Sequence, residues 1–159
     1  PPWVFMAARL LTALAVSVLM VVLVTLLGRI VYGVAIPTRT LPGLLLAVVV
    51  GTAACCCLGF ALTAVIPSEN AAPAVTNALV LPLYFFSGIF IPNDDIPRGM
   101  QIVGDIFPVK HLFQALLAAF NPLTKGAGIE GVHLLVLAGW GLAGLLVASR
   151  TFRWSPRSS

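Results

Sequence analysis

Few side chains in this sequence have the types and spacing that catalysis or metal binding requires. Glu130 and His133 form a Glu-x-x-His pair, the pattern with which one helix of a di-metal bundle supplies ligands, but such a site needs a second copy and further glutamates. We interpret the pair as interfacial residues at a helix start, where a glutamate complements the helix dipole. His111 beside Lys110 can sense pH or bind an anion. We interpret these two as interfacial residues at the start of a short helix.

The cysteines offer no second site. Cys55, Cys56 and Cys57 follow one another in an apolar stretch, and successive helical positions point about 100° apart, so the three thiols do not converge on one metal. They also lack the spacing of a disulfide framework. No G-x-x-x-x-G-K-[ST] motif occurs that would cradle phosphates. The sequence predicts a non-catalytic chain with no catalytic residue, no metal site and no cofactor of its own.

Composition then identifies the surroundings in which the chain must fold. Of its 159 residues, 60% are hydrophobic and 9% are charged, whereas a soluble domain carries roughly a quarter charged residues to cover its surface. The same balance excludes a disordered chain. The net charge of +4 comes from single basic residues spread along the chain, without the clustered patch that nucleic-acid binding requires. We expect an all-α membrane protein in contact with lipid.

Four apolar runs are long enough to cross a bilayer, which takes about 20 residues. They are residues 10–28, 43–66, 71–91 and 131–149. Arg9 and Arg29 bracket the first run, and Glu130 and Arg150 bracket the last, each pair 20 residues apart. Because 20 residues of helix measure about 30 Å, these charged residues are predicted to anchor the two spans at the membrane interfaces.

Small residues indicate which spans pack against one another. The second run contains the segment 51–54, Gly-Thr-Ala-Ala, and the last run pairs Gly144 with Ala148 and Gly139 with Ala143. Such small-xxx-small patterns let helix backbones approach closely in lipid. We expect both runs to lie inside a bundle.

The third run departs from a plain membrane anchor. Pro82 lies inside it and is predicted to kink the helix. Asn77, Tyr84 and Gly88 fall on one helical stripe. Because an unpaired asparagine is costly in hydrocarbon, this stripe either contacts another helix or lines a polar path. Within the four spans the only charged or imidazole side chain is His133, which speaks against a proton-coupled transporter.

Residues 93–128, between the last two spans, are expected to form a helical hairpin. An amphipathic helix follows Ile96, and a second short helix runs from Val109 to Phe120. Each has about 12 residues and a length of about 18 Å, too short to cross the membrane. The hairpin therefore lies in the interface as a cover, or it re-enters the membrane and helps to close a translocation path.

Two segments carry a family resemblance: LPLYFFSGIFIPNDDIP at residues 81–97 and FPVKHLFQALLAAF at residues 107–120. With the amphipathic helix between them, they resemble the type-2 ATP-binding-cassette (ABC) permeases. Those permeases have a proline in the fifth membrane helix, a Ser-Gly-x-x-x-Pro turn, a proline after the amphipathic helix and a basic end to the last helix. The matching residues here are Pro82, Ser87, Gly88, Pro92, Pro108, and Arg150 with Arg153.

The resemblance implies a single, partial transmembrane domain over residues 1–159, equivalent to the last four of six membrane helices. It implies an exporter in the bacterial plasma membrane, with both termini in the cytoplasm and the hairpin outside. Two permease subunits would form the path, and a separate ATPase would bind ATP and Mg. Drugs, lipids and glycans are the substrate classes. A secondary transporter or channel subunit and a non-transporting membrane scaffold are the alternatives.

Overall fold

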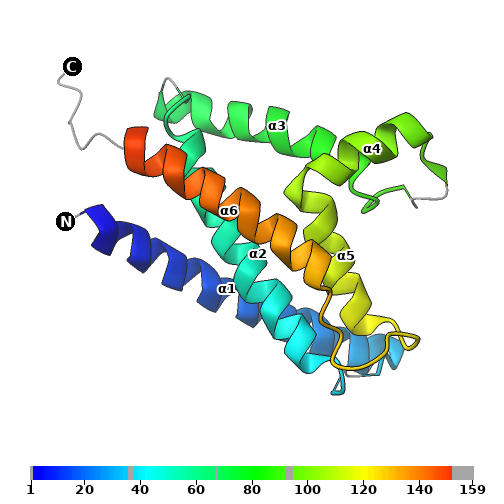
Figure 1. Cartoon of the computed structure of the whole chain (residues 1–159). Helices are drawn as coiled ribbons and strands as arrows, with labels where there is room; N and C mark the ends of the chain where they lie inside the picture. Colours follow the sequence, from blue (N-terminus) through cyan, green and yellow to red (C-terminus); the bar gives the residue numbers. More distant parts are fainter. Residues whose placement is uncertain (1, 36–37, 67, 92–94, 152–159) are drawn as a thin grey trace.

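The computed structural model describes residues 2–35, 38–66, 68–91 and 95–151, and this part of the chain is all helical (Figure 1). Its elements are α1 (Pro2–Tyr32), α2 (Leu41–Leu62), the short 3-10 helix η1 (Glu69–Ala71), α3 (Ala72–Phe86), α4 (Arg98–Ile106), α5 (Pro108–Phe120) and α6 (Gly131–Thr151). Among the described residues, α1, α2 and α6 are long and apolar enough to cross a membrane, and the bent pair of α4 and α5 is a candidate fourth span. The predicted all-α membrane fold is confirmed.

The centre of the bundle is α2, which packs against α1, α5 and α6. Close contacts between α2 and α6 occur at Gly141 beside Ala54 and at Gly144 beside Cys57, so the two helices run in the same direction. Ala148 is fully buried, and the predicted packing role of Gly144 and Ala148 is confirmed. Open space surrounds Gly139 and Ala143 is exposed, so this pair makes no close contact with another helix among the described residues, and its packing role stays a prediction. The first turn of α1 and the last turn of α6 lie at the same end of the bundle (Figure 1).

The third helix is shorter than the run that predicted it. Residues 71–91 were expected to be helical, but α3 has 15 residues and ends at Phe86. The chain leaves the helix in a turn at Ser87 and Gly88, where Gly88 has a φ of 83°. That left-handed conformation suits glycine and ends the helix. At about 1.5 Å per residue α3 is about 22 Å long, which is less than the thickness of a hydrocarbon core.

The short helix α5 lies along the first half of α2. At one end, the hydroxyl of Thr40 donates a hydrogen bond to the carbonyl oxygen of Ala119. One turn further, Ala119 belongs to a buried cluster with Leu44 and Val48. At the other end of α5, Leu112 lies directly over Gly51, close to the middle of α2. The start of α5 is therefore the end that reaches deepest into the bundle.

Candidate functional site

The candidate site is the bend between α4 and α5. The two helices meet at an angle of 92°. Pro108 is the first residue of α5, and a proline disfavours the helical conformation in the residue before it. Phe107 is accordingly extended, with φ −89° and ψ 146°, and its backbone N–H donates to the carbonyl of Gly104 at 3.2 Å. The sequence therefore ends α4 abruptly and turns the chain within one residue.

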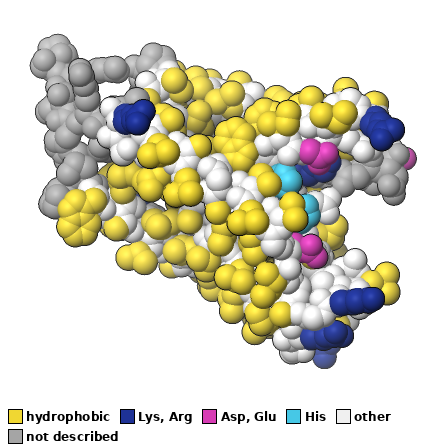
Figure 2. Space-filling model, viewed as in Figure 1, with side chains coloured by type: hydrophobic (Ala, Val, Ile, Leu, Met, Phe, Trp, Pro, Cys, Tyr) yellow, Lys and Arg dark blue, Asp and Glu magenta, His cyan; other side chains and the backbone are white. Residues whose placement is uncertain are grey.

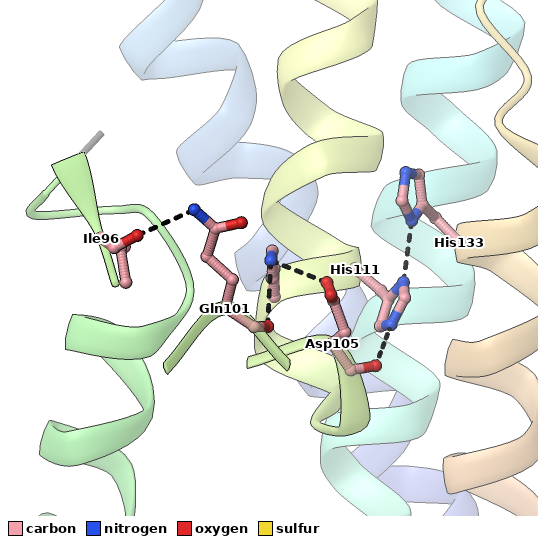
Figure 3. A network of polar contacts seen from close by, with 6 residues as sticks. Ile96, Gln101, Asp105, His111 and His133 are labelled. Atoms are coloured by element: carbon pink, nitrogen blue, oxygen red, sulfur yellow. Dashed lines mark hydrogen bonds and ion pairs between the residues drawn. The ribbon is translucent and has the colours of Figure 1, made fainter. Parts of the chain in front are cut away.

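An abrupt helix end leaves backbone carbonyls without intrahelical partners. Side chains from the next two helices supply the missing donors. Nε2 of His111 donates to the carbonyl of Asp105 at 2.8 Å (Figure 3). Nε1 of Trp140, from α6, donates to the carbonyl of Ile106 at 2.8 Å. The end of α4 is thus capped by α5 and α6, which fixes the hairpin against the last span.

A lysine adds a charge to this cap. The Nζ atom of Lys110 lies 2.7 Å from Oδ1 of Asp105 and donates to the carbonyl of Gln101 at 3.3 Å. A cation near a helix C-terminus interacts favourably with the helix dipole. The Lys110 side chain is 10% exposed, whereas that of Asp105 is 59% exposed. The pair therefore joins a buried cation to a carboxylate at the surface of the protein.

The two histidines of the chain meet beside this ion pair. Nδ1 of His111 lies 2.8 Å from Nδ1 of His133, and the ring centres are 5.1 Å apart (Figure 3). Because Nε2 of His111 donates its proton to a carbonyl, its Nδ1 is the acceptor, and His133 donates from Nδ1. This contact joins the first turn of α5 to the first turn of α6.

Lys110 and His111, interpreted from the sequence as interfacial residues, are buried in the protein, and their depth relative to the membrane interface stays a prediction. Both are only 8% exposed, because the bend places the first turn of α5 between α4 and α6. Figure 2 shows histidine and acidic side chains close together on a face that is otherwise mostly hydrophobic. Sequence reasoning missed this cluster, although the short spacing of Asp105, Lys110 and His111 around Pro108 was a signal for it.

The depth of the bend can be measured along α6. Trp140, which contacts the carbonyl of Ile106, lies nine residues after Gly131 and therefore about 14 Å along α6. The candidate span Gly131–Arg150 has 20 residues, and His133, which contacts His111, is its third residue, so the bend lies beside the first half of this span. Leu112 over Gly51 gives a matching depth on α2. Of the two arrangements expected for the hairpin, the geometry favours re-entry into the bundle over a cover at its end.

The predicted stripe on the third run is only partly helical. Asn77 and Tyr84 lie on exposed positions of α3, but Gly88 lies two residues beyond its end and does not extend the stripe. The stripe's role in helix contact or in a polar path stays a prediction. Pro82 lies inside α3. Ser87 is almost completely buried, and its hydroxyl donates to the carbonyl of Tyr84 at 2.9 Å.

The predicted interface anchors lie near the helix ends. Arg9 and Arg29 are exposed on α1, which extends beyond both of them, and Arg150 is exposed in the last turn of α6. Glu130 is half-buried directly before α6, and its carbonyl accepts the N–H of Leu134. Their anchoring role stays a prediction. Two other predicted residues, Pro92 and Arg153, lie outside the described residues.

An apolar cavity lies beside the start of α5. Its volume is about 510 Å³, and side chains of α1, α2 and α5 line it, among them Ser17, Thr52, Cys55 and Leu112. The hydroxyls of Ser17 and Thr52 are its few polar groups, near the middle of α1 and α2. In the part of the chain that the structure describes, no three histidine, cysteine or acidic side chains are grouped as metal ligands.

Comparison with known proteins identifies a family for most of the chain. The family model described as "ABC-2 type transporter" matches residues 1–121. No curated protein and no solved structure gives a match. The matched region comprises 121 of the 159 residues and includes α1 to α5 with the bend. The chain therefore belongs to the ABC-2 type transporter family, as a membrane domain with several spans.

Proposed function

We propose that this chain is the permease subunit of an ATP-driven exporter. In this proposal it forms a translocation path together with a second permease subunit and is driven by a separate ATPase. The observation that carries the proposal is the re-entrant pair of α4 and α5, whose bend packs beside the first half of α6. A membrane anchor has no need of such an element.

The bend supports a polar path because it places non-helical backbone and ionisable side chains within the bundle. Backbone that leaves the helix at membrane depth is tolerated only where protein or water satisfies it. Ionisable side chains at that depth face the bundle interior or a water-filled cavity. Lys110 faces the interior, while the carboxylate of Asp105 is more than half exposed. In the proposed path, water would reach this carboxylate through an aqueous recess beside α4.

The nearby apolar cavity favours substrates with a hydrophobic part. It borders the start of α5 through Leu112, on the side of α2. A drug, a lipid or a lipid-linked glycan would combine an apolar part for this cavity with a polar part for the recess. ATP and Mg would bind to the partner ATPase, because the chain has no phosphate-binding loop.

The arrangement of the termini favours one orientation. The described ends of the chain lie at one end of the bundle and the hairpin at the other (Figure 1). In the proposed orientation the termini lie in the cytoplasm of a bacterial cell, where the ATPase binds, and the hairpin opens outward.

Purification with native partners tests the proposal. The complex should contain a P-loop ATPase, and proteoliposomes should transport substrate only with hydrolysable ATP. A matched complex with the P-loop lysine of the ATPase replaced should bind but not transport. A stable complex without any P-loop protein would contradict the proposal.

A secondary transporter is the second candidate, and the buried Lys110 and the histidine pair are the observations that favour it. Transport that continues without ATP and stops when an ion gradient collapses would support that candidate instead. A non-transporting scaffold would keep full activity of its complex in the variants Pro82→Leu and Gly88→Leu, whereas a permease should insert normally and lose transport.

A further inference from the structure

The contact between His111 and His133 does more than cap a helix. The carbonyl at the end of α4 needs only Nε2 of His111, which it has. The second nitrogen of His111 is used for a separate purpose, the 2.8 Å contact with Nδ1 of His133. This contact, which we name the histidine latch, joins the re-entrant pair to α6.

Whether the latch can form depends on the protonation of the two rings, because protonation changes the number of hydrogen-bond acceptors. A neutral histidine has one N–H and one acceptor nitrogen, and a cationic histidine has two N–H groups and no acceptor. With Nε2 of His111 committed as a donor, Nδ1 of His111 accepts while that residue is neutral. A first proton can bind to Nε2 of His133 and leave the contact intact. A second proton on Nδ1 of His111 places two donors 2.8 Å apart and breaks it.

Charged groups around the latch come from three segments. Lys110 precedes His111 on α5, the Asp105 carboxylate pairs with Lys110 from α4, and Glu130 lies three residues before His133. The two other helices nearby contribute no charge, since α2 contains no Asp, Glu, Lys, Arg or His and α3 contains only Tyr84 as a titratable group. When both histidines are cationic, they face each other and Lys110. Like charges at this distance repel.

We propose that the histidine latch is a proton-operated switch, which holds the re-entrant pair against α6 at neutral pH and releases it when both histidines are protonated. Release frees the first turns of α5 and α6 to separate, while Trp140 still holds the carbonyl of Ile106. This switch changes the conformation of the chain, and it does not depend on what the protein transports.

Histidine NMR of the full chain in lipid nanodiscs tests the latch directly, because the chain has only two histidines. With ¹⁵N-labelled histidine at pH 8, His111 should carry its proton on Nε2 and His133 on Nδ1. The protonation of both rings is then followed as the pH is lowered from 8 to 5. Over that range, amide hydrogen exchange of residues 108–114 and 131–137, corrected for intrinsic rates, should accelerate at least tenfold. Unchanged corrected exchange, or Nε2 protons on both neutral rings, would overturn the proposal.

Two variants separate the latch from general loosening. His133→Leu should exchange rapidly at pH 8 and show no further acceleration at pH 5. Trp140→Phe removes a neighbouring hydrogen bond, between α6 and α4, but no titratable group, so it should raise exchange at both pH values and keep the tenfold pH response. If His133→Leu keeps the wild-type response, the proposal is wrong. The wild-type titration decides the matter even if that variant fails to fold.

Discussion

At Gly104, α4 closely approaches the end of α3. A Cβ atom at this position would lie 2.2 Å from the carbonyl oxygen of Phe86, at the end of α3, and 3.2 Å from Cδ of Lys110. The lysine side chain can move, but the carbonyl is backbone. We therefore predict that Gly104→Ala undocks the hairpin from α3, although it adds only one methyl group.

The size of the effect follows from this distance. Ordinary contacts of a Cβ atom begin near 3.4 Å, so α4 and the end of α3 must separate by 3.4 − 2.2 = 1.2 Å. Inserting a methyl group into a packed site typically costs about 1–3 kcal/mol. Because 1.4 kcal/mol corresponds to a factor of about ten, the docked population should fall by about 5- to 150-fold relative to the undocked one.

Hydrogen exchange of residues 98–106 in nanodiscs measures this population, and ATP-driven transport by the reconstituted complex measures its consequence. Gly99→Ala is the matched control, since it makes the same change on the same helix in open space. It should slow exchange slightly, because alanine favours a helix by about 1 kcal/mol over glycine. Equal exchange in the two variants would refute the proposed close contact at Gly104.

Three further predictions concern other parts of the bundle. Gly144→Ala should destabilise the protein by about 1–3 kcal/mol in a detergent unfolding titration, because the new Cβ meets the backbone of Cys57 at 2.8 Å, while Gly139→Ala points into open space and should not. Asp105→Asn should cost about 1–3 kcal/mol in the same titration, because it removes the carboxylate that pairs with the buried Lys110 ammonium and leaves it the carbonyl of Gln101, whereas Lys110→Met should cost less; the opposite order would show that the ion pair is misassigned. Asn77→Leu should impair subunit assembly if Asn77 contacts another helix, or transport if it lines a polar path. Normal transport together with normal assembly would contradict both roles.

Helix positions in this chain could be predicted from the sequence because apolar length and proline position decide them. The runs 10–28 and 131–149 correspond to α1 and α6, and Pro108 separates α4 from α5 as expected. The end of α3 could not be predicted in this way. Apolar residues continue to Ile91, but the chain turns at Ser87, whose side chain is buried and bonded to Tyr84. That turn is made locally by Ser87 and the left-handed Gly88, which hydropathy does not report.

The polar cluster escaped prediction for a different reason. A helical wheel describes one helix, whereas Lys110 and His111 act on carbonyls of the preceding helix across a 92° bend. Once the bend is known, their placement follows, because the last carbonyls of α4 need donors and the first turn of α5 supplies them. Capping does not explain His133, which contacts only the nitrogen of His111 that the cap leaves unused. The contact between His111 and His133 satisfies no backbone group, so it can be lost without unfolding the bundle. The histidine latch is therefore the point at which the hairpin and α6 can separate.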